Sequence, residues 1–349
     1  MRIIQQKKKR IALQMPEGLL LFACTIADLL LEFCEEVEEV VIMGDVTYGA
    51  CCIDDFTAVA LGCDLLVHYG HSCLVPIDIT TISVLYVFVD IKMDVQHFID
   101  TVKHNVSSDS KVAFVCTIQF AASLHNAKIE LSKYFGASNI LVPQSLPLSP
   151  GEVLGCTSPR LPEDFKIVVC LGDGRFHLES VMIHNSKTVD KFYKYDPYSK
   201  IFTTEEYDYG RMVSVRWQAI EKAKKASKIG VVLGTLGRQG NPNILKHITA
   251  SLAKADKDFV VVLLSEIIPS KLKKFKEIEA WVQVACPRLS VDWGAYFGGT
   301  PVLNSYEASV CFGGAEWCGE EGTETYPMDY YSAGGGEWSN AERFNRKKK

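Results

Sequence analysis

The strongest constraint on the fold is an alternation of short apolar runs with longer stretches of helical periodicity. Ten runs of four to six residues, rich in valine, isoleucine and leucine, have the length and composition of buried strands. They are residues 11–15, 40–45, 65–69, 84–89, 112–117, 140–143, 167–171, 229–233, 259–264 and 281–285. Helical segments between buried strands are typical of parallel sheets, so we predict an α/β protein.

The alternation also repeats three times along the chain. In each repeat a strand leads into an amphipathic helix, and then into a second strand followed by a loop of small residues. The helices are residues 19–33, 123–134 and 243–255, and the loops are residues 44–52, 148–156 and 265–270. We therefore predict three related α/β domains, residues 1–107, 108–225 and 226–312, with parallel sheets arranged around a central site. The charged stretch 221–228 sets the second boundary.

The last part of the sequence has a different composition. Residues 313–349 contain glycine pairs and triplets, an acidic Glu320-Glu-Gly322 and a basic end, Arg346 to Lys349. Such a composition is poor in core-forming residues. We expect residues 313–349 to be a flexible Gly-rich tail.

Charge and hydropathy exclude two classes of partner. The 37 Lys and Arg against 42 Asp and Glu give a formal charge of −5, which is the wrong sign for a protein whose main partner is nucleic acid. No apolar run is long enough to span a membrane, and the basic N-terminal residues precede no clean apolar stretch with a small-residue cleavage site. We expect a cytoplasmic protein with no membrane partner.

The chain has twelve cysteines, spread from Cys24 to Cys318. They lack the dense spacing of a disulfide-stapled secreted domain, so most should be reduced. No CxxC pair occurs, which removes the usual signature of thioredoxin-type chemistry and of a zinc ribbon. Any metal site must therefore be assembled from distant parts of the chain.

Three of the cysteines share a distinctive setting. Cys51, Cys156 and Cys286 each lie beside glycine, alanine or proline in a loop after a strand, one in each proposed domain. Ligands bind at the carboxyl ends of parallel strands, so these thiols could converge. Three thiolates can hold a 4Fe-4S cluster and leave one iron open. Alternatively, a free cysteine packs as a small buried hydrophobe, an interpretation that suits Cys24, Cys34, Cys63, Cys116 and Cys170.

The residues around these cysteines resemble a known family. In order along the chain they read GDVTYGACCIDD (44–55), HYGHSC (68–73), SPGEVLGCTSP (149–159), LGDGRFHLES (171–180) and WVQVACPRLSVDW (281–293). These strings closely resemble the family of 2-(3-amino-3-carboxypropyl)histidine synthase subunit 1, which acts first in diphthamide biosynthesis. The resemblance covers roughly residues 10–310. Members of that family usually carry an N-terminal extension before the first strand, whereas this chain reaches it at Ile11.

The resemblance implies an activity, cofactors and partners. By motif, Cys51, Cys156 and Cys286 would be the three ligands of a 4Fe-4S cluster, and Cys52 would fall outside the ligand set. S-adenosylmethionine would be the co-substrate, and its 3-amino-3-carboxypropyl group would be transferred as a radical to C2 of a histidine in translation elongation factor 2. The implied partners are a related second subunit in a heterodimer, elongation factor 2 as protein substrate and a small CSL-type electron donor.

Two other functions remain open from the residues alone. The chain could be a non-catalytic subunit whose cluster is structural or relays electrons while a partner performs the cleavage. It could also be a zinc-binding or purely apolar scaffold in which the three cysteines only pack. The small-residue neighbours favour the catalytic interpretation, because packing alone would not require a glycine or proline beside each thiol.

Several polar residues near these loops admit a structural or a functional role. His68 and His71 could line the S-adenosylmethionine site, although a hydrogen-bonded structural role is favoured. Arg238 or Gln239 could hold the amino acid carboxylate of the substrate, and Asp54 is expected to cap the following helix. The turn at residues 172–177 could orient substrate or form a salt-bridged turn through Asp173, Arg175 and His177.

Overall fold

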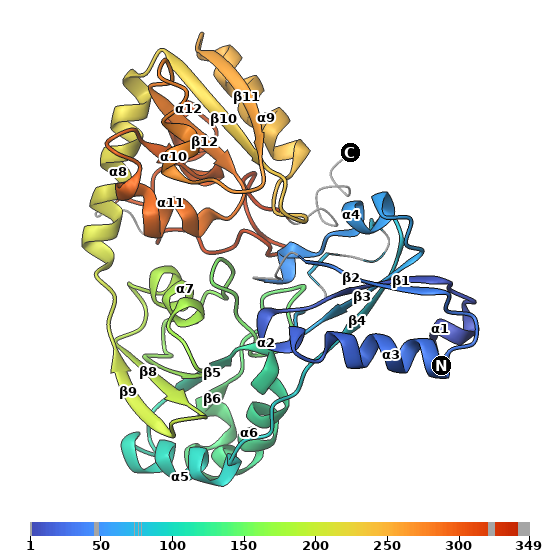
Figure 1. Cartoon of the computed structure of the whole chain (residues 1–349). Helices are drawn as coiled ribbons and strands as arrows, with labels where there is room; N and C mark the ends of the chain where they lie inside the picture. The colour runs from blue at the N-terminus through green and yellow to red at the C-terminus, as the bar shows by residue number, and fades with distance from the viewer. Residues whose placement is uncertain are drawn as a thin grey trace. The chain divides into compact units, whose positions relative to one another are not determined.

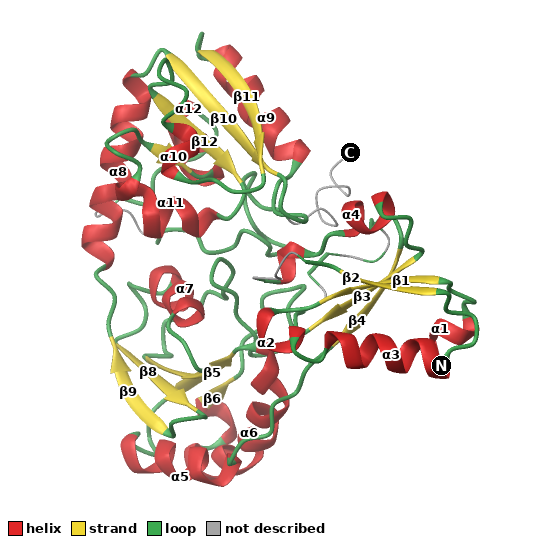
Figure 2. Ribbon diagram, in the orientation of Figure 1, coloured by secondary structure: helices red, strands yellow, loops and turns green. Residues whose placement is uncertain are grey.

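Three mostly parallel β-sheets with flanking helices form the molecule (Figures 1 and 2). The structure, a computed structural model, describes residues 2–44, 49–72, 74–75, 77, 79–319 and 325–340. All ten predicted strands are present, so the predicted α/β class is confirmed. Among the described residues no helix is both long and apolar enough to cross a membrane.

The first sheet has four parallel strands in the order β2-β1-β3-β4. The strands are β1 (Arg10–Gln14), β2 (Glu39–Ile42), β3 (Leu65–Tyr69) and β4 (Ser83–Val87). The helices are α1 (Arg2–Gln5), α2 (Glu17–Leu20), α3 (Ala23–Phe33), α4 (Asp55–Ala60) and the 3₁₀ turn η1 (Ala50–Cys52). Apolar side chains of β1 and β3, such as Ile11 and Val67, pack under α3 and bury the sheet on that face.

The second sheet has five strands in the order β6-β5-β7-β8-β9, of which only β8 and β9 pair in antiparallel fashion. The strands are β5 (Val112–Cys116), β6 (Ile140–Leu141), β7 (Ile167–Leu171), β8 (Lys191–Asp196) and β9 (Ile201–Glu205). The helices are α5 (Val95–Asn105), α6 (Ala121–Phe135), α7 (Phe176–His184) and the short turns η2 (Ile118–Phe120) and η3 (Ala137–Asn139). The strand order leaves β5 and β7 fully covered at the centre.

The third sheet repeats the topology of the first, in the order β11-β10-β12-β13. The strands are β10 (Lys228–Gly234), β11 (Asp258–Leu264), β12 (Ala280–Val284) and β13 (Val302–Leu303). The helices are α8 (Tyr209–Lys225), α9 (Pro242–Lys254), α10 (Pro269–Leu272), α11 (Pro287–Trp293), α12 (Ser305–Phe312) and the turn η4 (Gly294–Tyr296). The side chain of Asn241 caps α9, and Pro242 occupies its first turn, where proline costs no hydrogen bond.

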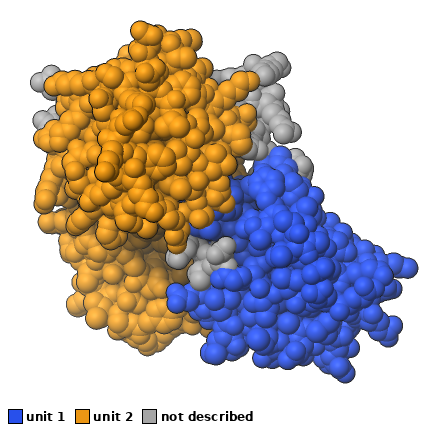
Figure 3. Space-filling view, turned by 45° about the horizontal axis from the view of Figure 1, so that its top comes forward, with its two compact units in different colours: residues 1–89, 236–239 blue, residues 90–235, 240–349 orange. Residues whose placement is uncertain are grey.

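The boundaries between the cores differ from the predicted ones. The chain divides into a compact unit 1, Met1–Val89 with Leu236–Gln239, and a compact unit 2, Asp90–Thr235 with Gly240–Lys349 (Figure 3). Helix α5 packs Phe98 and Val102 into the core of the second sheet, and α8 packs Ile220 into that of the third. Each predicted boundary, at 107 and at 225, therefore comes one helix too late, because the helix before it belongs to the following core.

The predicted flexible tail is wrong for the part that the structure describes, residues 313–319 and 325–340. Tyr326, Met328 and Tyr330 are almost completely buried. The glycines make a tight turn, because a Cβ on Gly335 would lie 2.6 Å from the carbonyl oxygen of Asp329. The prediction from composition failed because these glycines permit close packing of the chain. Glu320 to Gly322 and Arg346 to Lys349 lie outside the described residues.

Candidate functional site

Cys51 lies in the turn η1 of unit 1 and is half-buried. The loop of residues 236–239 belongs to the same unit and lies directly on this turn. The backbone N–H of Arg238 donates to the Cys51 carbonyl at 3.0 Å, and Nε2 of Gln239 lies 3.6 Å from the Cys51 sulfur. Gly237 has φ of +54°, and a Cβ there would lie 2.5 Å from the backbone of Cys52. Only glycine permits this approach.

Gln14, at the carboxyl end of β1, holds the same turn through two hydrogen bonds. Its Nε2 donates to the carbonyl of Cys52 at 2.7 Å, and its Oε1 accepts from the backbone N–H of Asp54 at 3.2 Å. Because Oε1 can only accept, Nδ1 of His68, 2.9 Å away, must donate to it. Burial and the neighbouring His71 lower the pKa of His68 to about 3, so this histidine is neutral. The structure shows a hydrogen-bonded role for Nδ1 of His68, whereas the buried Nε2 has no hydrogen-bond partner among the described residues.

Cys156 lies in unit 2, in the loop of residues 149–158, which we call the Cys156 loop; the residue is half-buried. A Cβ on the preceding Gly155 would lie 2.0 Å from the ring of Phe176, so a side chain there would displace either the ring or the loop. Burial and the nearby Cys286 raise the pKa of the Cys156 thiol to about 12. The hydroxyl of Thr157 lies 3.8 Å from its sulfur.

Cys286 follows β12 and immediately precedes α11, and it is also half-buried. Gln283 holds this loop as Gln14 holds the first, because its Nε2 donates to the Cys286 carbonyl at 2.9 Å. Burial raises the pKa of the Cys286 thiol, and the backbone N–H groups of Arg288 and Leu289 oppose that rise. Cys156 and Cys286 are close enough for their charges to interact.

Arg288 ties the two cysteine loops of unit 2 together and is only 2% exposed. Its Nη1 donates to the carbonyls of Gly155 at 2.9 Å and Phe176 at 2.8 Å. Its Nε donates to both carboxylate oxygens of Asp292, at 2.9 and 3.0 Å, and its Nη2 to Glu179 at 2.5 Å. The guanidinium also lies 4.3 Å from the centre of the Phe176 ring. The backbone beside Cys156 is thus fixed to the helix that follows Cys286.

The structure brings the loops of Cys156 and Cys286 together in unit 2, through Arg288, and places Cys51 in unit 1. Within the described part of the chain, no three His, Cys, Asp or Glu side chains gather as a metal site. The donor chemistry nevertheless fits a thiolate-bound cluster, since two half-buried thiols with raised pKa values need a cation to lose their protons. Most cysteines assigned to packing are buried, whereas Cys24 is exposed on α3; the buried ones are Cys34, Cys63, Cys116 and Cys170.

Arg238 does not present a free guanidinium to a substrate carboxylate. Its Nε and Nη2 donate to the two carboxylate oxygens of Asp55 at 2.7 and 2.6 Å, and its guanidinium lies 4.0 Å from the centre of the Phe56 ring. Asp55 is fully buried, and despite burial its ion pair with Arg238 and the Thr81 donors keep its pKa low. The pair instead fastens the 236–239 loop to α4. The predicted cap by Asp54 is confirmed, because its side chain accepts from the Thr57 backbone N–H at 3.0 Å.

The turn that leads into α7, residues 172–177, is held by ion pairs, which was the structural alternative to a role in orienting substrate. Nη1 of Arg175 donates to Glu205 at 2.6 Å, its Nη2 to the Glu206 carbonyl at 2.9 Å and its Nε to Glu179 at 3.4 Å. His177 packs edge-on against Phe176. This turn therefore joins α7 to β9 and supports Glu179, a partner of Arg288.

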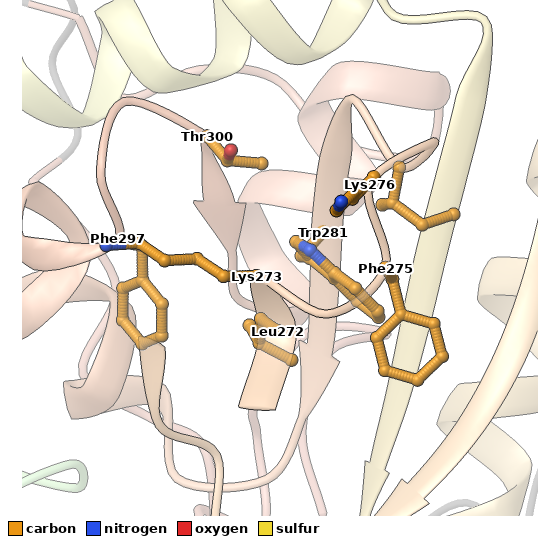
Figure 4. A pocket seen from close by; sticks show the side chains of 8 residues that line it. Leu272, Lys273, Phe275, Lys276, Trp281, Phe297 and Thr300 are labelled. Atoms are coloured by element: carbon orange, nitrogen blue, oxygen red, sulfur yellow. The ribbon is translucent and has the colours of Figure 1, made fainter. Parts of the chain in front are cut away.

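A cavity of about 230 Å³ lies elsewhere in unit 2, beside the third sheet (Figure 4). Trp281 and Phe275 form an edge-on aromatic pair at one wall, with Phe297 on another side. Lys273 and Lys276 supply its polar lining. None of the cysteines lines this cavity, so it is separate from the candidate site.

Comparison with known proteins identifies the family. A family model described as "Putative diphthamide synthesis protein" matches residues 15–322. The chain belongs to this diphthamide synthesis family. It is 55% identical over 347 residues to 2-(3-amino-3-carboxypropyl)histidine synthase subunit 1 of Dictyostelium discoideum, covering 97% of this chain and 71% of that protein. It is 53% identical over 341 residues to the Homo sapiens protein of the same name, covering 97% and 75%.

A solved structure supports the same assignment. The crystal structure of Dph2 from Pyrococcus horikoshii with a 4Fe-4S cluster matches this chain with a TM-score of 0.73 and 27% identity, over 93% of this chain and 92% of that one. The family recognised from the sequence motifs is therefore confirmed, and with it the transferase class of the diphthamide synthesis family. The name "subunit 1" of the relatives indicates that they work in a complex of several subunits.

Proposed function

We propose that this chain transfers the 3-amino-3-carboxypropyl group of S-adenosylmethionine to C2 of a histidine in translation elongation factor 2, as the first step of diphthamide biosynthesis. In the net reaction the sulfur–Cγ bond breaks and a carbon–carbon bond replaces the C2–H bond of the imidazole. Methylthioadenosine and a proton leave. The reaction is radical in character, and its site is a 4Fe-4S cluster bound by Cys51, Cys156 and Cys286.

One observation carries this proposal. Cys156 and Cys286 are far apart in the sequence, yet both are half-buried, and Arg288, in the helix that follows Cys286, donates to the carbonyl of Gly155 beside Cys156. The small neighbours of Cys156 serve this placement, since Gly155 lies against the Phe176 ring where no side chain fits. Packing alone would be satisfied by serine or alanine in place of the thiols. A relative of the same fold carries a 4Fe-4S cluster, which matches this donor chemistry.

Cys51 is the third ligand in this proposal, and it comes from the other compact unit. Its loop has the same design as that of Cys286, because a glutamine at the end of a central strand binds a cysteine carbonyl in each: Gln14 for Cys52 and Gln283 for Cys286. When bound, the cluster would supply the single electron that breaks the sulfur–carbon bond and an open iron for the substrate.

The residues of this chain hold and position that site. Gln14, Gln283 and Arg288 fix the backbone of the cysteine loops through buried hydrogen bonds. The raised pKa values of Cys156 and Cys286 keep both thiols protonated until iron displaces the protons. Ligands that are held rigidly in place before the metal binds favour one cluster geometry over others.

The proposal includes three partners and a compartment. A related second subunit would complete a heterodimer, in line with the name "subunit 1" of the relatives. Elongation factor 2 would be the protein substrate, and a small CSL-type protein would deliver electrons. All of these belong in the cytoplasm, where thiols stay reduced.

An anaerobic transfer assay tests the proposed function. The chain co-expressed with its second subunit is incubated with elongation factor 2, a reductant and S-adenosylmethionine labelled in the carboxylate. We expect methylthioadenosine and labelled elongation factor in equal amounts, and loss of both in Cys156→Ala and Cys286→Ala. Cys52→Ala is the matched control and should keep activity.

The assay also separates this function from that of a non-catalytic subunit. If Cys51→Ala, Cys156→Ala and Cys286→Ala all retained full transfer while a cysteine variant of the second subunit abolished it, the chemistry would belong to the partner. A wild-type complex that releases no methylthioadenosine would contradict the proposed reaction itself.

A further inference from the structure

The carbonyl groups of the three cysteine loops are held in two different ways. The carbonyls of Cys52 and Cys286 accept from the side chains of Gln14 and Gln283. The Cys156 carbonyl, like that of Cys51, accepts from a backbone N–H; its donor is Tyr330, at 3.3 Å. This donor comes from the last described segment of the chain, residues 325–340, which we call the C-terminal strap. The strap also lies beyond the residues that the family model matches, 15–322.

The strap runs along the Cys156 loop as a short antiparallel pairing. Thr157 and Asp329 form a β-bridge. The Ser158 N–H donates to the Met328 carbonyl at 2.8 Å, and the Tyr331 N–H donates to the Thr157 hydroxyl at 3.0 Å. That hydroxyl is the one 3.8 Å from the Cys156 sulfur. Three successive residues of the loop, 156–158, are thus paired with the strap.

Both ends of the strap are anchored on helices and loops around the third sheet. At its start, the Tyr326 hydroxyl donates to Glu307 at 2.8 Å. Glu307 forms a buried ion pair with Arg216, whose Nε and Nη2 both approach to 2.6 Å. Towards its end, the Trp338 indole N–H donates to Asp329 at 2.8 Å and its ring packs edge-on against Tyr306.

The close-packed glycines show that this path is specific. A Cβ on Gly336 would lie 2.4 Å from the Trp338 ring, so the turn at residues 334–336 seats the indole. The Asn340 N–H then donates back to the Tyr330 carbonyl at 2.6 Å. Tyr330, which donates to Cys156, is itself only 1% exposed. A segment fixed at both ends and buried in the middle restrains what it pairs with.

We propose that residues 325–340 are a positioning element for the metal site, which holds the Cys156 thiol in place as Gln14 and Gln283 do for the other two cysteine loops. The strap acts through the backbone of residues 156–158 and does not contact the reacting atoms. The role in cluster binding rests on the proposed function, because it needs Cys156 to be a ligand. The restraint of the loop itself does not.

The test compares two truncations in the complex with the second subunit. One ends at residue 324 and removes the strap, and the control ends at residue 340 and removes only the residues after it. The cluster-free samples are treated with N-ethylmaleimide, and alkylation of Cys156 and Cys51 is followed by mass spectrometry together with amide exchange of residues 153–158. Iron per chain is then measured after anaerobic reconstitution.

Loss of the strap should speed alkylation of Cys156 roughly tenfold or more and abolish slow exchange in its loop, because the paired backbone groups become free. Cys51, in the other unit, should react at its wild-type rate and so reports that unit 1 is unaffected. Iron should fall in the truncation at 324 and stay normal in the truncation at 340. Thr157→Val, which removes only the acceptor of the Tyr331 N–H, should show a smaller change in the same direction.

Two results would overturn the proposal. Unchanged Cys156 alkylation and exchange in both the truncation at 324 and Thr157→Val would show that the strap does not restrain the loop. Faster alkylation of Cys156 and faster amide exchange in its loop, together with a normal iron content per chain, would show that the restraint has no role in metal binding. Failure of the proposed function is distinguishable, because a Cys156→Ser chain with full iron content would contradict the ligand assignment while leaving the alkylation result intact.

Discussion

Replacing Arg288 by methionine should destabilise unit 2 and loosen the cysteine pair. The side chain makes five hydrogen bonds, two to backbone carbonyls and three to the carboxylates of Asp292 and Glu179. Methionine fills similar space without donating to any of them. Asp292 is then left without its buried counter-charge, and Glu179 keeps only the more distant Arg175.

The magnitude follows from the burial of the three charges. Removing one partner of a buried ion pair typically costs about 3–5 kcal/mol. Arg288 has a side chain only 3% exposed, but those of Glu179 and Asp292 are 21% and 26% exposed, so solvent screens part of the loss. We expect a loss near the lower limit, about 3 kcal/mol in the free energy of unfolding.

Tryptophan fluorescence during urea denaturation measures this loss for unit 2 alone. All five tryptophans, at positions 217, 281, 293, 317 and 338, belong to that unit. The control is Arg175→Met, which removes a partner of both Glu179 and the buried Glu205 from a side chain that is 46% exposed. It should cost only about 1 kcal/mol, because Lys194 still faces Glu205. Equal losses in the two variants would refute the reasoning.

The pH dependence gives a second check on the same variant. Burial already raises the pKa of Asp292 although Arg288 opposes the rise. Without Arg288 this pKa rises further, so the folded chain binds a proton that the unfolded chain releases. The stability of Arg288→Met should therefore fall as the pH rises. Its loss of unfolding free energy relative to the wild type should be smaller at about pH 5 than at about pH 8. A deficit independent of pH would point to packing and not to charge.

Three further perturbations have defined outcomes. Burial raises the pKa of Glu152 from 4.5 to about 7, so wild-type stability should fall by roughly 3 kcal/mol as the pH rises through this window; urea denaturation of Glu152→Gln at several pH values should not show that fall. Gly155→Ala should lower iron per chain after reconstitution, because its Cβ overlaps Phe176, whereas Gly174→Ala, with open space around it, should bind iron normally. Asp54→Ala should lower the unfolding temperature of unit 1 by removing a cap worth about 1 kcal/mol, Asp54→Ser should keep most of it, and equal losses would contradict the capping role.

Much of the fold could be predicted because the central strands of each sheet are buried along almost their whole length; they are β1, β3, β5, β7, β10 and β12. Such strands read as continuous apolar runs, as in β5 and β7, and their positions followed directly. The hairpin of β8 and β9 was missed because its strands mix charged and polar residues with apolar ones, so neither forms a continuous apolar run. Strand β13 has only two residues, too few for any periodicity.

The cysteines of the candidate site could be proposed from the sequence, and their role as ligands stays a prediction, whereas the residues that hold their loops could not be foreseen. Small residues beside Cys156 and Cys286 marked loops where the backbone must approach another element closely, and the structure gives Gly155 that role. Arg288 gave no such signal, since its partners lie more than one hundred residues away in Gly155 and Phe176. The C-terminal strap was hidden by its composition, because glycines that seat an aromatic ring look the same in sequence as glycines in a mobile tail.

The most direct test of the account is whether three cysteines, and no neighbouring fourth, hold the cluster. The complex with the second subunit is reduced anaerobically, and its electron paramagnetic resonance spectrum is recorded against a sample with Cys51, Cys156 and Cys286 all changed to serine, which subtracts any signal of the partner. The account predicts a 4Fe-4S signal that is lost or degraded in each single serine variant and unchanged in Cys52→Ser. A wild-type difference spectrum without signal, or single variants that keep it in full, would contradict the account.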